Sequence, residues 1–85
     1  MKVREIRYVC VPSLVIEIYP LGMYGTGNVY FRGLVADIPK ILFEEDVLGF
    51  FPIYCYAQDL SLGFSIEYDE NLMKECSNSK KEDEQ

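Results

Sequence analysis

The last nine residues of the chain, Ser77 to Gln85 (SNSKKEDEQ), contain no apolar side chain. Such a segment cannot bury enough surface to offset the entropy lost on ordering, so we expect residues 77–85 to form a disordered charged tail. Only residues 1–76 remain to build a core, and they hold all seven Tyr and all five Phe. A chain of this length makes a single domain with a thin core.

Short segments of alternating polarity predict about four strands. Residues 14–19 alternate as a half-buried strand, and residues 29–35 are apolar on both faces, which suits a central strand,. Residues 50–57 contain Pro52, which cannot donate to a ladder and favours an edge,. Residues 62–68 alternate most clearly, and we expect them to form a hairpin with residues 50–57,.

The N-terminal residues 2–9 fit an amphipathic helix of about two turns, because Val3, Ile6 and Cys10 fall on one side of it,. Their Val, Ile and Tyr content leaves a strand as the open alternative. Residues 71–76 have room for one further helical turn.

A second short helix is expected to begin at Asp37 and Pro39, with Asp37 as a cap,. Ile38, Ile41 and Leu42 would then form one buried stripe, and the helix would end near Glu45 or Asp46,. The predicted fold class is α+β: a small antiparallel sheet of about four strands, one or two short helices and a disordered C-terminal tail.

Residues that common catalytic centres need are missing from the sequence. Histidine is absent, which removes Cys–His and Ser–His–Asp systems and the commonest transition-metal ligand,. The number of cysteines is odd, and the three are widely spaced along the chain: Cys10, Cys55 and Cys76. This pattern is typical of thiols in a reducing cytosol and not of disulfides or a zinc site. We therefore expect no enzyme activity, no cofactor and no metal.

Charge is divided unevenly along the chain. Residues 1–32 carry four basic and two acidic side chains, whereas residues 33–85 carry four lysines and twelve acidic side chains. This balance opposes direct nucleic-acid binding and favours docking on a basic protein surface, for example that of a nucleic-acid-binding effector. We find no signal peptide and no apolar run of membrane-spanning length, so we expect a cytoplasmic protein without membrane contact.

The candidate protein-binding residues include four carboxylates, Asp37, Glu44, Glu45 and Asp46. The last three would lie at the negative end of the predicted helix dipole. Carboxylates are unfavourable at the negative end of a helix dipole. Their presence there marks a functional surface, or it means only that the helix is too short for its dipole to matter. The simpler interpretation is a solvated face, as for most charge runs. A calcium loop is excluded because the central glycine is absent.

Residues 20–28 (PLGMYGTGN) form a glycine-rich connection between two predicted strands,. Met23 and Tyr24 are the other candidate protein-binding residues, because Met and aromatic side chains are enriched at interfaces,. The glycine spacing matches neither the dinucleotide fingerprint nor the P-loop, and a mobile loop is the simpler interpretation.

Two other functions stay open. In a small-ligand binder that sequesters a signalling nucleotide, Arg7, Arg32, Gly25 and Gly27 would meet the phosphates,. In a structural role, the chain would form a homo-oligomer along an open strand edge.

One pattern is shared with known sequences. A strand is followed by G-N-x-x-F-x-G-x-x-x-D-I-P at Gly27, Asn28, Phe31, Gly33 and residues 37–39, and the chain opens with KVREI. The pattern resembles small uncharacterised phage and mobile-element proteins of Firmicutes. This resemblance transfers no catalytic residue. It implies a small accessory protein in a bacterial cytoplasm, of a kind that includes anti-CRISPR and other counter-defence inhibitors. Our hypothesis from the sequence is therefore a non-enzymatic acidic binding module that inhibits a host protein by docking.

Overall fold

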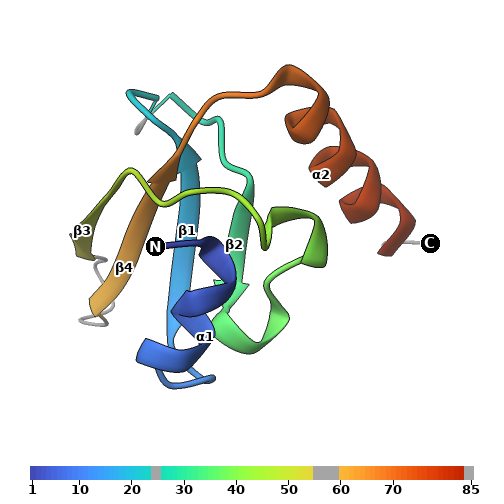
Figure 1. Cartoon of the computed structure of the whole chain (residues 1–85). Coiled ribbons are helices and arrows are strands. Elements are labelled where there is room, and N and C mark those ends of the chain that lie inside the picture. The colour runs from blue at the N-terminus through green and yellow to red at the C-terminus, as the bar shows by residue number, and fades with distance from the viewer. Residues whose placement is uncertain (24–25, 55–59, 84–85) are drawn as a thin grey trace.

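The computed structural model describes residues 1–23, 26–54 and 60–83. A four-stranded sheet in the order β2-β1-β4-β3 forms one layer, and helices and turns form a second layer against it (Figure 1). The strands are β1 (Val15–Pro20), β2 (Phe31–Leu34), β3 (Gly49–Tyr54) and β4 (Leu60–Ile66). The predicted α+β class and the number of strands are confirmed.

The sheet is mixed, whereas the sequence predicted an antiparallel one. β1–β2 and β3–β4 are antiparallel pairs, and the second is the predicted hairpin. The central pair, β1 with β4, is parallel. The chain returns from β2 across one face of the sheet before β3 begins, so the second hairpin can place β4 beside β1 in the same direction (Figure 1),.

Strand order explains the burial of each strand. β1 was predicted to be half-buried, but it lies in the middle of the sheet, and Glu17 and Tyr19 are buried as well as Ile16 and Ile18. β2 was predicted to be central and is an edge strand. β3 is the other edge, as Pro52 indicated,.

The N-terminal segment is helical, which decides between its two alternatives. A 3-10 turn, η1 (Val3–Glu5), leads directly into α1 (Ile6–Val9). Val3 and Ile6 are fully buried and Cys10 is half-buried, so the predicted buried side of the helix is confirmed.

The helix predicted from Asp37 to Glu45 or Asp46 is absent. In its place are two 3-10 turns, η2 (Val35–Asp37) and η3 (Lys40–Leu42). Proline disfavours the helical conformation in the residue before it, and Ile38 accordingly has a ψ of 125° while Pro39 itself has a ψ of 139°,. Ile41 is consequently exposed, Asp37 does not cap, and no helix dipole reaches residues 44–46.

α2 (Glu70–Asp83) is longer than the single turn expected over residues 71–76. Leu72 and Cys76 are buried against the sheet, and Met73 is half-buried. The helical backbone thus continues into the segment expected to be a tail. Residues 77–83 contain no apolar side chain, so the core contacts of α2 come from its first turns. That residues 77–85 form a disordered tail outside the domain stays a prediction.

The core lies between one face of the sheet and the helices. Every helical element contributes to it, and its members include Val3, Ile6, Ile16, Ile18, Val35, Leu42, Phe64, Ile66 and Leu72. β1 and β2 pair in unbroken register through Gly33, where a Cβ atom would lie 3.1 Å from the Phe31 ring. The absence of a Cβ atom at Gly33 therefore lets the Phe31 ring approach the backbone closely. No helix in the described part of the chain is long and apolar enough to cross a membrane.

Candidate functional site

The acidic stretch, which we define as Glu44, Glu45 and Asp46, lies against the N-terminal segment. The backbone N–H groups of Val3 and Arg4 donate to the carbonyl oxygens of Glu45 (2.9 Å) and Phe43 (3.1 Å), and Val47 donates to Met1 (2.7 Å). Lys2 and Asp46 form an isolated antiparallel bridge. The first residues of the chain therefore run alongside the acidic stretch.

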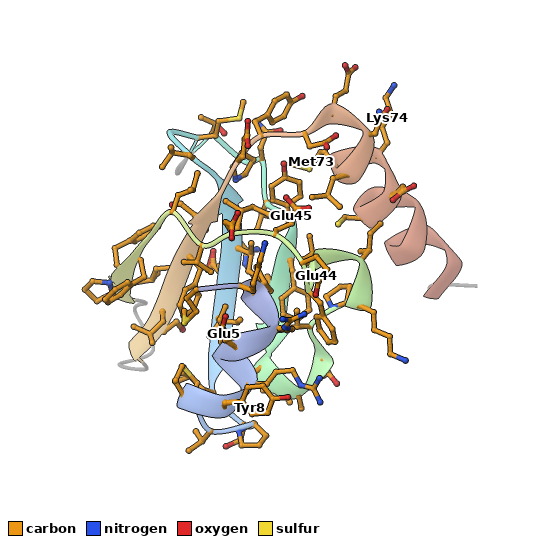
Figure 2. The ribbon with its side chains drawn as sticks, viewed as in Figure 1. Glu5, Tyr8, Glu44, Glu45, Met73 and Lys74 are labelled. Carbon is orange, nitrogen blue, oxygen red and sulfur yellow. The ribbon has the colours of Figure 1, made fainter. Side chains whose placement is uncertain are left out.

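Two basic side chains of this segment balance the acidic stretch. The Arg4 guanidinium pairs with Glu44, and the Lys2 Nζ lies 3.1 Å from Asp46 Oδ1 and donates to the Glu44 carbonyl oxygen. Glu44 and Asp46 nevertheless keep 70% and 68% of their side-chain surface exposed. Glu45 is half-buried and lies between α1 and α2 in the view of Figure 2. The three carboxylates therefore do not form one uncompensated acidic face.

The remaining predicted protein-binding residues are separate from this stretch. Asp37 is exposed at the end of η2. Met23 is half-buried in the 20–28 connection, where the Thr26 hydroxyl donates to its carbonyl oxygen at 2.7 Å. Tyr24 lies outside the described residues, as does Gly25. Gly27 has a φ of +90°, a conformation that favours glycine,.

The predicted phosphate-binding arginines lie on opposite sides of the sheet. Arg7 belongs to α1, on the core side, and its guanidinium lies 5.2 Å from the centre of the Phe43 ring. Arg32 of β2 pairs with Glu17, whose side chain faces away from the core because it alternates with Ile16 and Ile18,. The structure therefore does not bring Arg7 and Arg32 together.

The sheet face that carries Glu17 receives no helical element of the described chain, since all of them pack into the core on the other face. We call it the open face. Arg32, Glu17, Gly63 and Phe51 form one row across the four strands. The Glu17 carboxylate accepts a hydrogen bond from the Tyr19 hydroxyl and lies 3.3 Å from Arg32 Nη2. The sequence placed Glu17 and Tyr19 on one face, but it gave no signal for the contact with Arg32.

A second polar network connects Tyr30, which directly precedes β2, to the start of α2. The Tyr30 hydroxyl donates to the Glu67 carbonyl oxygen (3.1 Å) and accepts from the Asp69 N–H (2.8 Å). Burial raises the pKa of Tyr30 above its ordinary value, the Asp69 backbone hydrogen bond opposes this rise, and the Asp69 and Glu45 carboxylates add to it. Asp69 Oδ1 in turn accepts from the N–H groups of Asn71 and Leu72, which starts the helix,.

The exposed side chains around the start of α2 are mostly acidic. We use the name α2 acidic face for Glu67, Glu70 and Glu75, which are all exposed, although Glu70 and Glu75 lie about 140° apart around the helix and so do not form one flat patch,. Between residues 67 and 75 the only basic side chain is Lys74, which lies 3.7 Å from Glu70 and points away from the sheet (Figure 2). The sequence indicated acidity here but no particular surface, because the surface depends on which side of the helix packs inward.

Two cysteines, Cys10 and Cys76, are free thiols in the described residues, and Cys55 lies outside them. Burial, with a smaller effect from the Glu75 carboxylate, raises the pKa of the Cys76 thiol. Over the described ranges, no group of three or more His, Cys, Asp or Glu side chains is placed to hold a metal ion.

Comparison with known proteins finds no matching family model, no matching curated protein and no matching solved structure. The resemblance to phage and mobile-element proteins therefore depends only on the sequence, through the Gly27–Pro39 pattern, the strand before it and the opening KVREI.

Proposed function

We propose that the protein is a non-enzymatic binding module that docks on a basic surface of a host protein, in the manner of a phage counter-defence inhibitor. The observation that carries the docking proposal is the α2 acidic face, with three exposed carboxylates and a single lysine among them. An exposed surface of one sign attracts a partner of the opposite sign and speeds its association. The phage context rests on the sequence pattern alone.

The acidic stretch is the weaker of the two acidic surfaces for this role. Its Glu44 and Asp46 already have cationic partners in Arg4 and Lys2, so a basic partner would have to replace them. Such exposed pairs contribute only about 0–1 kcal/mol, so replacement is feasible but adds little affinity. Glu67 and Glu75 have no cationic partner among the described side chains, so they give the larger gain.

Matched neutral variants separate the two surfaces. One triple variant removes the charge of the α2 acidic face: Glu67→Gln, Glu70→Gln and Glu75→Gln. The other removes the charge of the acidic stretch: Glu44→Gln, Glu45→Gln and Asp46→Asn. The tagged protein is used to capture partners from a bacterial host lysate at rising salt, and the captured proteins are identified by mass spectrometry. We expect the α2 variant to bind its partner about tenfold more weakly, since each exposed pair contributes about 0.5 kcal/mol.

The acidic-stretch variant should bind nearly as well as the native chain. If both variants capture the same partner as the native chain at every salt concentration, docking by charge is wrong. The counter-defence role is tested separately, by expressing the protein in a host with an active CRISPR system and plating a targeted phage. If the number of phage plaques does not rise although a basic partner is still captured, the proposed binding function stands and the counter-defence role is wrong.

A further inference from the structure

β2 is an edge strand with backbone groups that point away from the sheet. The Val35 N–H donates to the Leu14 carbonyl oxygen at 3.0 Å, which makes residues 35 and 14 a hydrogen-bonded pair. In an antiparallel ladder such pairs alternate, and the register pairs Gly33 with Ile16 and Phe31 with Ile18,. The N–H and C=O groups of Arg32 and Leu34 therefore face outward, away from β1.

The two edges of the sheet differ in how they are protected. The opposite edge, β3, has Pro52 in its middle, and proline in an edge strand leaves a further strand without a donor at that point,. β2 contains neither proline nor lysine, the residues that commonly keep edge strands from pairing,. Its one charge, Arg32, is balanced by Glu17 on the same face.

The side chains beside the β2 edge are apolar and partly exposed. Val15 and Leu34 lie directly opposite each other on the open face, with 43% and 38% of their surface exposed. On the core side, Gly33 has no side chain, and the Phe31 ring lies over it. A strand that paired with β2 would cover Leu34 and meet no side chain at Gly33.

We propose that β2 pairs with β2 of a second copy of this chain, antiparallel about a two-fold axis at Gly33. In this register Arg32 lies opposite Leu34 of the second copy, and the outward backbone groups of these two residues satisfy one another on both sides of the axis. Each arginine then faces a leucine instead of another arginine, and the two glycines meet where the chains are closest. This inference does not depend on the proposed docking function.

The assembly ends at two copies. The symmetric pairing uses both β2 edges, and the remaining outer edges are β3 strands that contain Pro52. An isologous contact of this kind closes on itself, whereas a head-to-tail contact continues into a filament. The product is an eight-stranded sheet.

Leu34→Pro tests the pairing directly. Proline fixes φ near −65°, and Leu34 has a φ of −76°, so the substitution fits the backbone,. It removes an N–H that faces outward and is not needed by β1. Leu34→Ala is the matched control, because it shortens the side chain and keeps the N–H. Light scattering on a size-exclusion column measures the mass of each, with circular dichroism and thermal melting as checks of folding.

We expect the native chain and Leu34→Ala to approach twice the 9.8 kDa chain mass as concentration rises, and Leu34→Pro to remain at 9.8 kDa with an unchanged far-ultraviolet spectrum. Amide hydrogen exchange gives a second readout on the native chain. The Arg32 and Leu34 amides should become protected only at high concentration, while the Gly33 amide, which bonds to β1, is protected throughout. A native chain of 9.8 kDa at every concentration, or a Leu34→Pro dimer, would overturn the proposal.

Discussion

Gly63 lies on β4 under the side chains of β3, and its lack of a Cβ atom is needed there. A Cβ at this position would be 2.7 and 2.8 Å from atoms of the Phe51 ring and 2.9 Å from Ile53 Cδ1. We expect Gly63→Ala to lower the free energy of unfolding by about 1–3 kcal/mol, because both side chains must move. Urea denaturation followed by circular dichroism measures the change.

Gly49 provides the matched control for Gly63. It lies on β3 opposite Ser65, and a Cβ there would meet nothing within 4 Å. Gly49→Ala should be neutral or stabilise the fold by up to about 1 kcal/mol, since alanine restricts the unfolded chain. Equal effects of the two substitutions would show that the Phe51 ring does not confine Gly63.

Glu17 is a buried carboxylate whose hydrogen-bond partners come from two strands. Tyr19→Phe removes the hydroxyl that donates to it and leaves Arg32, which is 60% exposed, as its cationic partner. A buried acceptor that loses a donor costs about 1–3 kcal/mol, so the free energy of unfolding should fall by that amount. Tyr68→Phe, at an exposed position, should change it by less than about 0.5 kcal/mol,. A Tyr19→Phe chain as stable as the native one would mean that water replaces the hydroxyl.

At the scale of the elements, two groups where α2 meets the core, Tyr30 and Cys76, hold their protons more tightly in the folded protein than in the unfolded chain. The pKa values of Tyr30 and Cys76 are raised above their ordinary values of 10.0 and 9.0, in both cases mainly by burial. A raised pKa contributes stability that is present below the unfolded value and is lost as pH rises through the folded value. We therefore expect the free energy of unfolding to decline above about pH 9.

The contribution of Tyr30 to this decline can be isolated. Tyr30→Phe removes the titrating hydroxyl together with its bonds to Glu67 and Asp69, so the variant should be less stable at pH 8 and lose less further stability by pH 11. Urea denaturation at several pH values gives both slopes. Tyr8→Phe, on the exposed side of α1, should keep the native slope. Parallel slopes for Tyr30→Phe and the native chain would contradict a role for Tyr30 in the alkaline loss.

The elements themselves followed from sequence periodicity more readily than their arrangement. The spacing of Val3 and Ile6 predicted the first helix, and the alternation of apolar and polar residues from Leu62 onward predicted β4. The prediction of a helix over residues 37–46 was wrong because it gave more weight to the spacing of Ile38, Ile41 and Leu42 than to Pro39. Proline restricts the backbone of the residue before it, and the segment forms two 3-10 turns instead,. Apart from Pro52, which indicated an edge position for β3, strand order has no local signal, and so the burial of Glu17 and the parallel pairing of β1 could not be predicted,.

The same limit applies to the candidate site. The acidity of residues 44–46 is visible in the sequence, but the Arg4–Glu44 pair joins side chains 40 positions apart. Residues at such separation meet only through the complete fold. The α2 acidic face has a local signal in Glu67, Glu70 and Glu75, and what the structure adds is that Leu72 and Cys76 turn the other side of the helix inward.

For the whole molecule, the central pair joins strands from opposite ends of the chain. β1 ends at Pro20 and β4 begins at Leu60, so the sheet forms only when both hairpins are present. Among the side chains whose burial the structure describes, Cys76 is the last that belongs to the core. Residues 1–76 therefore hold all the core side chains that the structure describes, and the sequence of residues 77–85 contains no apolar residue.

Two shortened chains test this division. A chain ending at Cys76 should keep the native free energy of unfolding within about 0.5 kcal/mol, because residues 77–85 bring no apolar side chain to the core. A chain ending at Asp69 also loses Leu72 and Cys76 and should be less stable by at least about 2 kcal/mol, since burying one leucine contributes that much. Urea denaturation measures both. If the chain ending at Cys76 is as unstable as the shorter one, the second half of α2 supports the fold, and the boundary of the domain lies at Asp83 instead.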